Sequence, residues 1–151
     1  MEENLTLREM EDSFIRDLNE LGDWFLQYEY LLAISGELAH IPAEERTEER
    51  RVQGCQSGVW LKLSCREGRI RVLADSDPLI IRGLLAIIVF TLDGRTPEEV
   101  ASYEPRFLTQ TELHRQISTD RFRGLNAVVG AIRDFAAACV EEEKGGDQDG
   151  A

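Results

Sequence analysis

The segment from Leu79 to Leu92 is apolar around nearly its whole helical circumference, and this feature constrains the fold more than any other. Arg82 and Gly83 interrupt the run, so it is shorter than the roughly 18 consecutive apolar residues of a membrane span. A helix that is apolar on all sides is buried. The segment therefore predicts a central helix, with Asp77 as its cap and Pro78 at its first position.

Helical periodicity predicts further helices around this centre. A capping box at Thr6 and Glu9 precedes a first helix that ends at Gly22. Asp23 is expected to cap a second helix that ends near Ala39, and a last long helix begins near Ser118 or Thr119. A further capping box, at Thr96 and Glu99, predicts a short helix that begins there, between the central helix and the last one.

Two segments alternate between apolar and polar residues with the period of a β-strand. They are 59–65 and 70–74, and the intervening Glu67-Gly68 predicts the turn of a β-hairpin. With the helices, they give an α+β fold in which a small antiparallel sheet, of about three strands, packs on several helices. We expect one domain over residues 1–140 and an acidic, disordered tail over 141–151.

The charge of the chain narrows its possible partners. The 29 acidic and 17 basic residues give a net charge of -12, which repels phosphate backbones and anionic membrane surfaces. We therefore expect neither nucleic acid nor membrane as a partner. The start, Met1-Glu2-Glu3-Asn4, lacks the basic residues and apolar run of a secretory signal, which favours a cytoplasmic location.

The three cysteines differ in their surroundings. Cys65 and Cys139 fall on apolar faces of predicted elements and are expected inside the core. Cys55 lies in the polar, glycine-containing loop Gln53-Gly54-Cys55-Gln56-Ser57, just before Trp60, where a thiol is accessible and reactive. The spacing predicts no metal site, since there is no C-x-x-C pair. Free loop cysteines also occur without a function, so the loop alone leaves both alternatives open.

Arg121 is unusual because it lies in the first turn of the last helix, where its charge opposes the helix dipole. One explanation is an anionic neighbour: a thiolate or persulfide near Arg121 and the helix N-terminus would be stabilised, with a lowered pKa. The other is a surface ion pair with an acid such as Asp120. His40 and His114 are isolated, so no Cys-His pair is evident.

Five motifs, spread in order over residues 23–137, resemble the SufE-like family of sulfur acceptors for cysteine desulfurases. They are Trp24 with Tyr28-x-Tyr30-Leu31, Val52-Gln53-Gly54-Cys55-Gln56-Ser57-x-Val59-Trp60, Asp75-Ser76-Asp77 followed by Arg82-Gly83-Leu84, Thr96-Pro97, and Arg121-x-x-Gly124-Leu125. The sequence departs from the family pattern at Arg51, at Ala74 and in the acidic tail.

The resemblance implies an α+β fold shared with iron–sulfur scaffold proteins, and it implies a chemistry. Cys55 would take persulfide sulfur from a SufS-like or CsdA-like desulfurase, stimulate that enzyme, and pass the sulfur to an Fe–S scaffold complex. Arg121 would lie near this site, and Gln53, Gly54, Gln56, Ser57, Trp60, Asp75 and Asp77 would shape the loop or bind the partner. The chain would be an accessory protein without a cofactor of its own, while the desulfurase carries pyridoxal phosphate.

Two other functions stay open at this point. The shared fold also suits a metal or Fe–S scaffold, although no cysteine, histidine and aspartate set surrounds Cys55 at ligand spacing. A non-catalytic regulator that only docks on a desulfurase is the second. The sequence leaves open the oligomeric state and whether Cys55 is sheltered or exposed at rest.

Overall fold

Helix α3 (Leu79–Leu92) lies at the centre of the fold, as its apolar circumference predicts. Every residue of α3 except Leu79 and Phe90 is buried. In this computed structural model, which describes the backbone of residues 5–150 and the side chains of residues 5–143, α3 contacts α1, α2, β2 and α6. The other elements are α1 (Leu7–Leu21), α2 (Trp24–Ser35), the 3₁₀ turn η2 (Ala43–Glu45), β1 (Val59–Arg66), β2 (Arg69–Ser76), α4 (Pro97–Ala101), α5 (Leu113–Gln116) and α6 (Thr119–Gly150).

The fold is α+β, as predicted, but the sheet has two strands in the described residues rather than about three. Strands β1 and β2 pair antiparallel from Val59↔Ser76 to Arg66↔Arg69. Glu67 and Gly68 both have positive φ angles, 54° and 74°, which is the type I′ geometry that suits a two-residue hairpin. In place of a third strand there is one isolated bridge, between Arg51 and Trp60. The residues just before it form a turn, in which the N–H groups of Arg50 and Arg51 donate to the Thr47 carbonyl.

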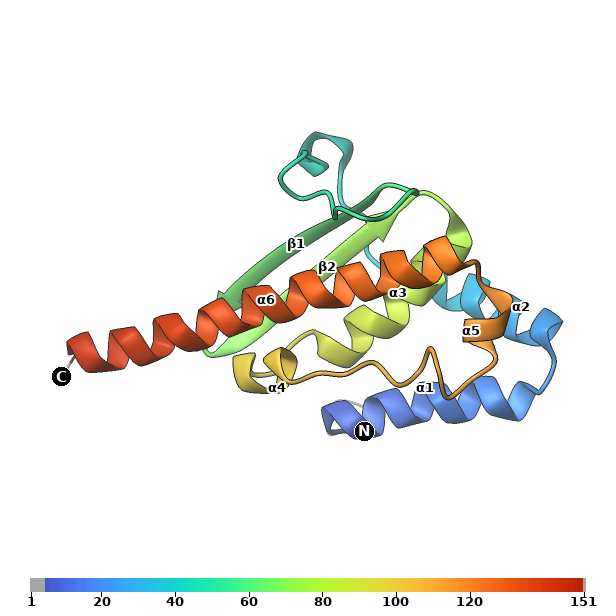
Figure 1. Ribbon diagram of the computed structural model, residues 1–151, viewed down its shortest axis with the longest axis horizontal. Helices are drawn as coiled ribbons and strands as arrows, with labels where there is room; N and C mark the ends of the chain where they lie inside the picture. The colour runs from blue at the N-terminus through green and yellow to red at the C-terminus, as the bar shows by residue number, and fades with distance from the viewer. Residues whose placement is uncertain (1–4, 151) are drawn as a thin grey trace.

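Helix α6 runs diagonally across one face of the molecule, over the sheet and α3, and its C-terminal end extends past the hairpin turn (Figure 1). Its start at Thr119 agrees with the predicted start. Helix α6 continues to Gly150 and so includes most of the region, from residue 141 on, for which the sequence predicts a disordered tail. The domain boundary at residue 140 stays a prediction. Among the described helices, none combines the length and apolar character needed to cross a membrane.

The predicted helix caps are confirmed at three positions and wrong at a fourth. Both capping boxes form, at Thr6 and Thr96, and the Asp23 side chain accepts a hydrogen bond from the N–H of Phe25. Asp77, by contrast, makes no cap for α3, and the helix begins after Pro78. The Asp77 carboxylate instead pairs with Arg46, which lies outside the helix.

Helix α2 is also shorter than predicted, since it ends at Ser35 rather than near Ala39. The buried Arg82 guanidinium donates to the carbonyl oxygens of Ser35, at 3.0 Å, and of Leu38. These bonds satisfy backbone acceptors at the end of α2, so the chain leaves the helix there without exposing them to an apolar interior.

Candidate functional site

Cys55 lies in a short closed loop of residues 53–58, which we call the Cys55 loop. The N–H of Val52 donates to the carbonyl of Val59 at 2.8 Å and so closes the base of the loop. Gly54 has a φ of 93°, a conformation that residues with a side chain rarely adopt. The loop is therefore tight, and it places Cys55 over the N-terminal half of α6.

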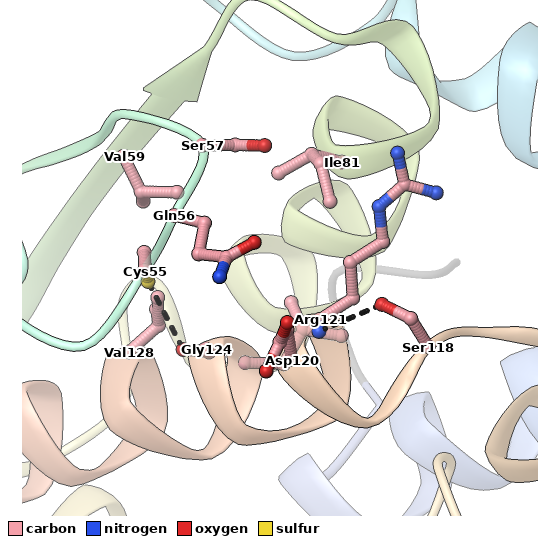
Figure 2. A pocket seen from close by; sticks show the side chains of 11 residues that line it. Cys55, Gln56, Ser57, Val59, Ile81, Ser118, Asp120, Arg121, Gly124 and Val128 are labelled. Atoms are coloured by element: carbon pink, nitrogen blue, oxygen red, sulfur yellow. Dashed lines mark hydrogen bonds between the residues drawn. The ribbon is translucent and has the colours of Figure 1, made fainter.

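The Cys55 side chain is half-buried and is directed at α6 rather than at solvent (Figure 2). Its Sγ–H donates to the carbonyl oxygen of Gly124 at 3.3 Å. A β-carbon built on Gly124 would lie 3.2 Å from this sulfur and 3.7 Å from the Cα of Cys55. Glycine at position 124 thus lets the loop lie directly on the helix, which gives a physical reason for the glycine in the Arg121-x-x-Gly124 motif.

Burial raises the pKa of the Cys55 thiol above its ordinary value, and the positive charge of Arg51 opposes this rise. This result is the reverse of the lowered pKa that the sequence predicts from Arg121 and the helix N-terminus. The reason is geometric: the sulfur is withdrawn from water against a helix carbonyl, and the cation that acts on it is Arg51. In this conformation the thiol is protonated at neutral pH and poorly nucleophilic.

A cavity of about 360 Å³ opens beside the sulfur. Arg121 and Asp120 line it from α6, Gln56 and Ser57 from the Cys55 loop, and Ile81 from α3 (Figure 2). The structure therefore brings Cys55, Gln56, Ser57 and Arg121 together, as the sequence predicts. Gln53 does not line this cavity; it is exposed and borders a separate groove along β1.

Arg121 contributes an unengaged cation to this cavity. Its backbone N–H is capped by the Ser118 hydroxyl at 3.1 Å, whereas its exposed side chain enters none of the ion pairs among the described residues, Asp120 included. The guanidinium extends upward beside Ile81 and away from the sulfur (Figure 2). The alternative explanation, a surface ion pair with Asp120, is thus not observed, and the cation is free to receive an anion that enters the cavity.

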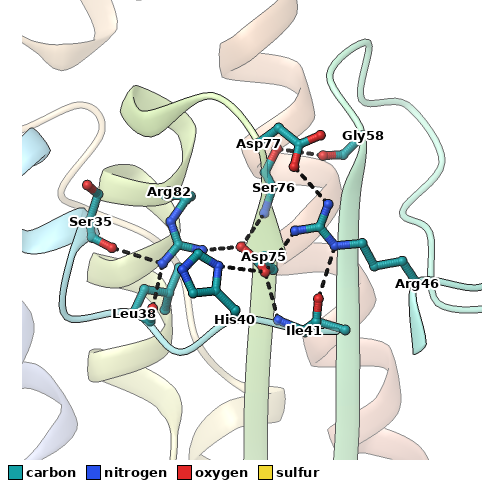
Figure 3. Close-up of polar contacts among 10 residues, drawn as sticks. All are labelled: Ser35, Leu38, His40, Ile41, Arg46, Gly58, Asp75, Ser76, Asp77 and Arg82. Carbon is teal, nitrogen blue, oxygen red and sulfur yellow. Dashed lines mark hydrogen bonds and ion pairs between the residues drawn. The ribbon is translucent and has the colours of Figure 1, made fainter. Parts of the chain in front are cut away.

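Two more of the predicted residues, Asp75 and Asp77, lie near the end of the Cys55 loop in a polar network centred on Asp75 (Figure 3). The Asp75 side chain is fully buried and accepts hydrogen bonds from the backbone N–H groups of Ile41 and Ser76 and from Arg46 and Arg82. Burial alone would raise its pKa, but these bonds and the Arg82 charge outweigh burial and hold the pKa below its usual value. A side chain without exposed surface offers nothing to a partner, so Asp75 organises the fold locally.

Arg46 connects this network to Trp60, which follows the loop in β1. It donates to Asp75 at 2.9 Å and to the exposed Asp77 at 2.8 Å, and its guanidinium lies 4.7 Å from the centre of the Trp60 ring. Ser76 completes the connection, since its hydroxyl donates to the carbonyl of Gly58 at 2.5 Å. The end of the Cys55 loop is therefore fixed to the sheet.

The sequence analysis assigns no role to three arginines that matter here: Arg46, Arg51 and Arg82. Arg82 had a visible signal, because a single cation inside an apolar helix must find a buried acid or carbonyl partner. Arg46 and Arg51 lie in the densely charged segment 43–51, where no pattern separates a solvated arginine from a paired one. Their roles depend on a chain reversal that only the tertiary structure shows.

The described side chains contain no group of three His, Cys, Asp or Glu residues placed to hold a metal ion. Cys139 is buried and Cys65 is half-buried, which agrees with their predicted interior positions. Burial, together with the neighbouring Cys65 thiol, raises the pKa of Cys139 to about 11. Cys55 is the thiol that lines the cavity described above, whereas Cys65 and Cys139 pack against the core, which leaves Cys55 as the candidate nucleophile.

Comparison with known proteins supports this fold and its motifs. Residues 12–136 match a family model described as SufE, the Fe-S metabolism associated domain. Among solved structures, the chain is similar to the solution structure of a hypothetical protein from Thermus thermophilus, with a TM-score of 0.71 and 20% sequence identity. That match covers 89% of this chain and 96% of the other, and at this identity it shows the fold alone.

Proposed function

This chain belongs to the SufE family and is associated with Fe–S metabolism, and we propose that within it Cys55 accepts persulfide sulfur from a cysteine desulfurase and passes it to an Fe–S assembly scaffold. The observation that carries the proposal is the placement of Cys55. A loop that is closed at its base and bound to the sheet at Gly58 holds the Cys55 thiol between a helix carbonyl and a cavity that Arg121 lines. A purely structural cysteine would need neither the cavity nor the cation.

The proposed step is a thiol–persulfide exchange without net oxidation. The Cys55 thiolate attacks the terminal sulfur of the desulfurase persulfide, a new S–S bond forms at Cys55, and the desulfurase cysteine leaves as a thiolate. The proton of Cys55 passes to solvent or to the departing thiolate. The same exchange, with Cys55 as the leaving thiol, hands the sulfur to a nucleophilic acceptor of the scaffold.

The cavity supports this chemistry because it has room for an added sulfur next to the one that Cys55 already carries. A cysteine persulfide extends the side chain by a single S–S bond, of about 2 Å, and the space beside the thiol measures about 360 Å³. We propose that Arg121 stabilises the terminal sulfur anion, because it lines the same cavity and has no ion-pair partner among the described residues; its guanidinium would turn from the position in Figure 2 toward the sulfur.

The exposed members of the loop would form the contact with the desulfurase. Gln53, Gly54 and Gln56 are exposed, and Asp77 lies at the surface next to the loop root. Trp60 and Asp75 would act indirectly, since Trp60 is half-buried beneath Arg46 and Asp75 is fully buried. We also propose a cytoplasmic location, because the chemistry requires reduced thiols and a reducing compartment maintains them.

The test is to incubate the protein with a cysteine desulfurase and free cysteine and to measure its intact mass. We expect the mass of one added sulfur, removed by a reductant, in the wild-type protein and in Cys65→Ala. No such sulfur should appear in Cys55→Ser. An added sulfur that persists in Cys55→Ser would refute the assignment, and undiminished stimulation of cysteine turnover by this variant would instead favour a docking regulator.

The role of Arg121 has its own test. Arg121→Glu should slow sulfur loading of Cys55, whereas Arg123→Glu, an equal charge change at an exposed position two residues further along α6, should not. The comparison removes the effect of net charge on association with the desulfurase. Equal loading rates for the two variants would exclude Arg121 from the transfer step.

A further inference from the structure

The outer edge of β1 is an open strand edge beside a groove. Arg50 and Val52 begin to pair with this edge: the N–H of Leu61 donates to the Arg50 carbonyl and the N–H of Val52 to the Val59 carbonyl, both at 2.8 Å. Pairing then stops, because the N–H of Arg50 donates to the Thr47 carbonyl instead and the chain turns away. The sheet thus holds an unfinished third strand.

The backbone groups beyond this point face the same edge. Antiparallel pairing alternates, so that the residues of β1 whose N–H and C=O do not bond to β2 direct them outward. Outward groups are therefore the carbonyl of Leu61, both groups of Leu63 and the N–H of Cys65. None of them has a hydrogen-bond partner among the described residues. The matching edge of β2 is already covered, since Ile70 exchanges hydrogen bonds with Arg95 and Gly94.

The groove beside this edge, here called the β1 groove, has a volume of about 660 Å³ and lies between β1 and α6. Apart from the exposed Asp134, its α6 wall is made of small or flat half-buried residues, Ala127, Gly130, Ala131 and Phe135, so an added backbone can approach closely. On the strand side it is lined by Leu61 and Leu63. Side chains of an added strand that point to this wall would be small and apolar.

The opposite face of the same edge is basic. Trp60, Lys62, Ser64 and Arg66 share that face of β1 by alternation, and Arg51 pairs with Trp60 there. Arg66 is exposed and enters no ion pair among the described residues, while Lys62 pairs with Glu45. Glu49 and Asp134 are the acids that line the β1 groove, and Arg50 and Arg51 are its basic lining residues. The charges that line the groove itself therefore balance, and the exposed Arg66 on the opposite face is the cation that an acidic side chain can approach without displacing an ion pair among the described residues.

We propose that the β1 groove binds an extended segment of a partner protein in which acidic residues alternate with small apolar ones. The segment would add to the sheet as its missing strand, with backbone hydrogen bonds to Leu61, Leu63 and Cys65. Its acidic side chains would face Lys62 and Arg66, and its apolar ones would face α6. A second copy of this chain fits less well, because its own β1 edge would bring Lys62 and Arg66 against the same cations.

The probe is a short capped peptide in which glutamate alternates with valine, added to the isotopically labelled protein. We expect saturable shifts and slowed hydrogen exchange at the amides of Leu63 and Cys65, and binding that weakens as salt is added. Arg66→Glu should weaken binding about tenfold. Arg16→Glu, an equal charge change at an exposed position on α1, should leave it unchanged.

Several results would overturn the proposal. These are the absence of saturable binding, equal binding of a peptide with lysine in place of glutamate, or shifts confined to other parts of the molecule. Self-association that protects the Leu63 amide would assign the edge to a second copy instead. Sulfur loading of Cys55 is measured separately, so failure of this proposal and failure of the proposed function are distinguishable.

Discussion

Replacing Gly124 by alanine places a methyl group 3.2 Å from the Cys55 sulfur. Optimal separation of such atoms is about 3.5 to 4.0 Å, so the sulfur must move by about 0.5 Å. The movement strains or breaks its bond to the Gly124 carbonyl, which is a weak bond of about 0.5–1 kcal/mol. With the lost contact, we expect the docked position of the Cys55 loop to lose about 1 kcal/mol, which increases the undocked population about fivefold.

The assay is the rate at which iodoacetamide alkylates Cys55 at neutral pH, followed by mass spectrometry of the peptide that contains it. Gly124→Ala should react about fivefold faster than the wild-type protein, since the undocked thiol regains an ordinary pKa. Global stability should not fall, because alanine improves helix propensity by about 1 kcal/mol.

Gly130→Ala is the matched control for this variant. It lies on the same helix, and a β-carbon there meets nothing within 4 Å. It should gain the same helix propensity and leave the alkylation rate of Cys55 unchanged. An unchanged rate in Gly124→Ala, or equal rates in both variants, would refute the view that Gly124 sets the position of the thiol.

Four further outcomes follow from the contacts described above. Arg82→Met should lower the free energy of unfolding by about 3–5 kcal/mol, measured by denaturant titration, because it removes the buried cation beside the Asp75 carboxylate, which keeps Arg46, and leaves the Ser35 and Leu38 carbonyls without this donor. The pKa of Asp75 is lower in the folded protein than in the unfolded chain, so ionised Asp75 stabilises the fold above its unfolded-state pKa, and this stabilisation is lost as the pH falls toward its folded-state pKa. The unfolding midpoint, measured as a function of pH, should show this loss, and the loss should be smaller in Arg82→Met. Arg51→Ala should shift the pH profile of Cys55 alkylation to higher pH, whereas Arg51→Lys should preserve it. Gly83→Ala should cost at least about 1–3 kcal/mol in thermal or denaturant unfolding, since its β-carbon would overlap the Leu31 carbonyl oxygen of α2; retained stability would show that the two helices separate easily.

Periodicity and local capping chemistry were enough to predict the central helix, the hairpin and the start of α6. These features depend on residues close in the chain, such as the Thr6 box or the Glu67-Gly68 turn. The failed cap at Asp77 had a different cause. Asp77 pairs with Arg46, which lies 31 positions away, and a long-range ion pair leaves no trace in local pattern.

The sequence predicted which residues form the site better than it predicted their electrostatics. Motifs placed Cys55 and Arg121 together, and both adjoin one cavity. The direction of the Cys55 pKa shift was wrong, because it depends on which atom the sulfur contacts and how much water remains around it. Sequence motifs identify reactive groups, but they do not show how far a side chain is buried in the conformation that it adopts.

The bond between Cys55 and the Gly124 carbonyl has a polarity, and that polarity makes the contact selective for one chemical form of the sulfur. A thiol has a proton to give to the carbonyl oxygen. A thiolate has none, so it would present a negative charge to an acceptor and be repelled. Ionisation of the Cys55 thiol and undocking of the loop from α6 would therefore favour one another. In the docked conformation the sulfur is therefore held as a thiol, the less nucleophilic of its two forms.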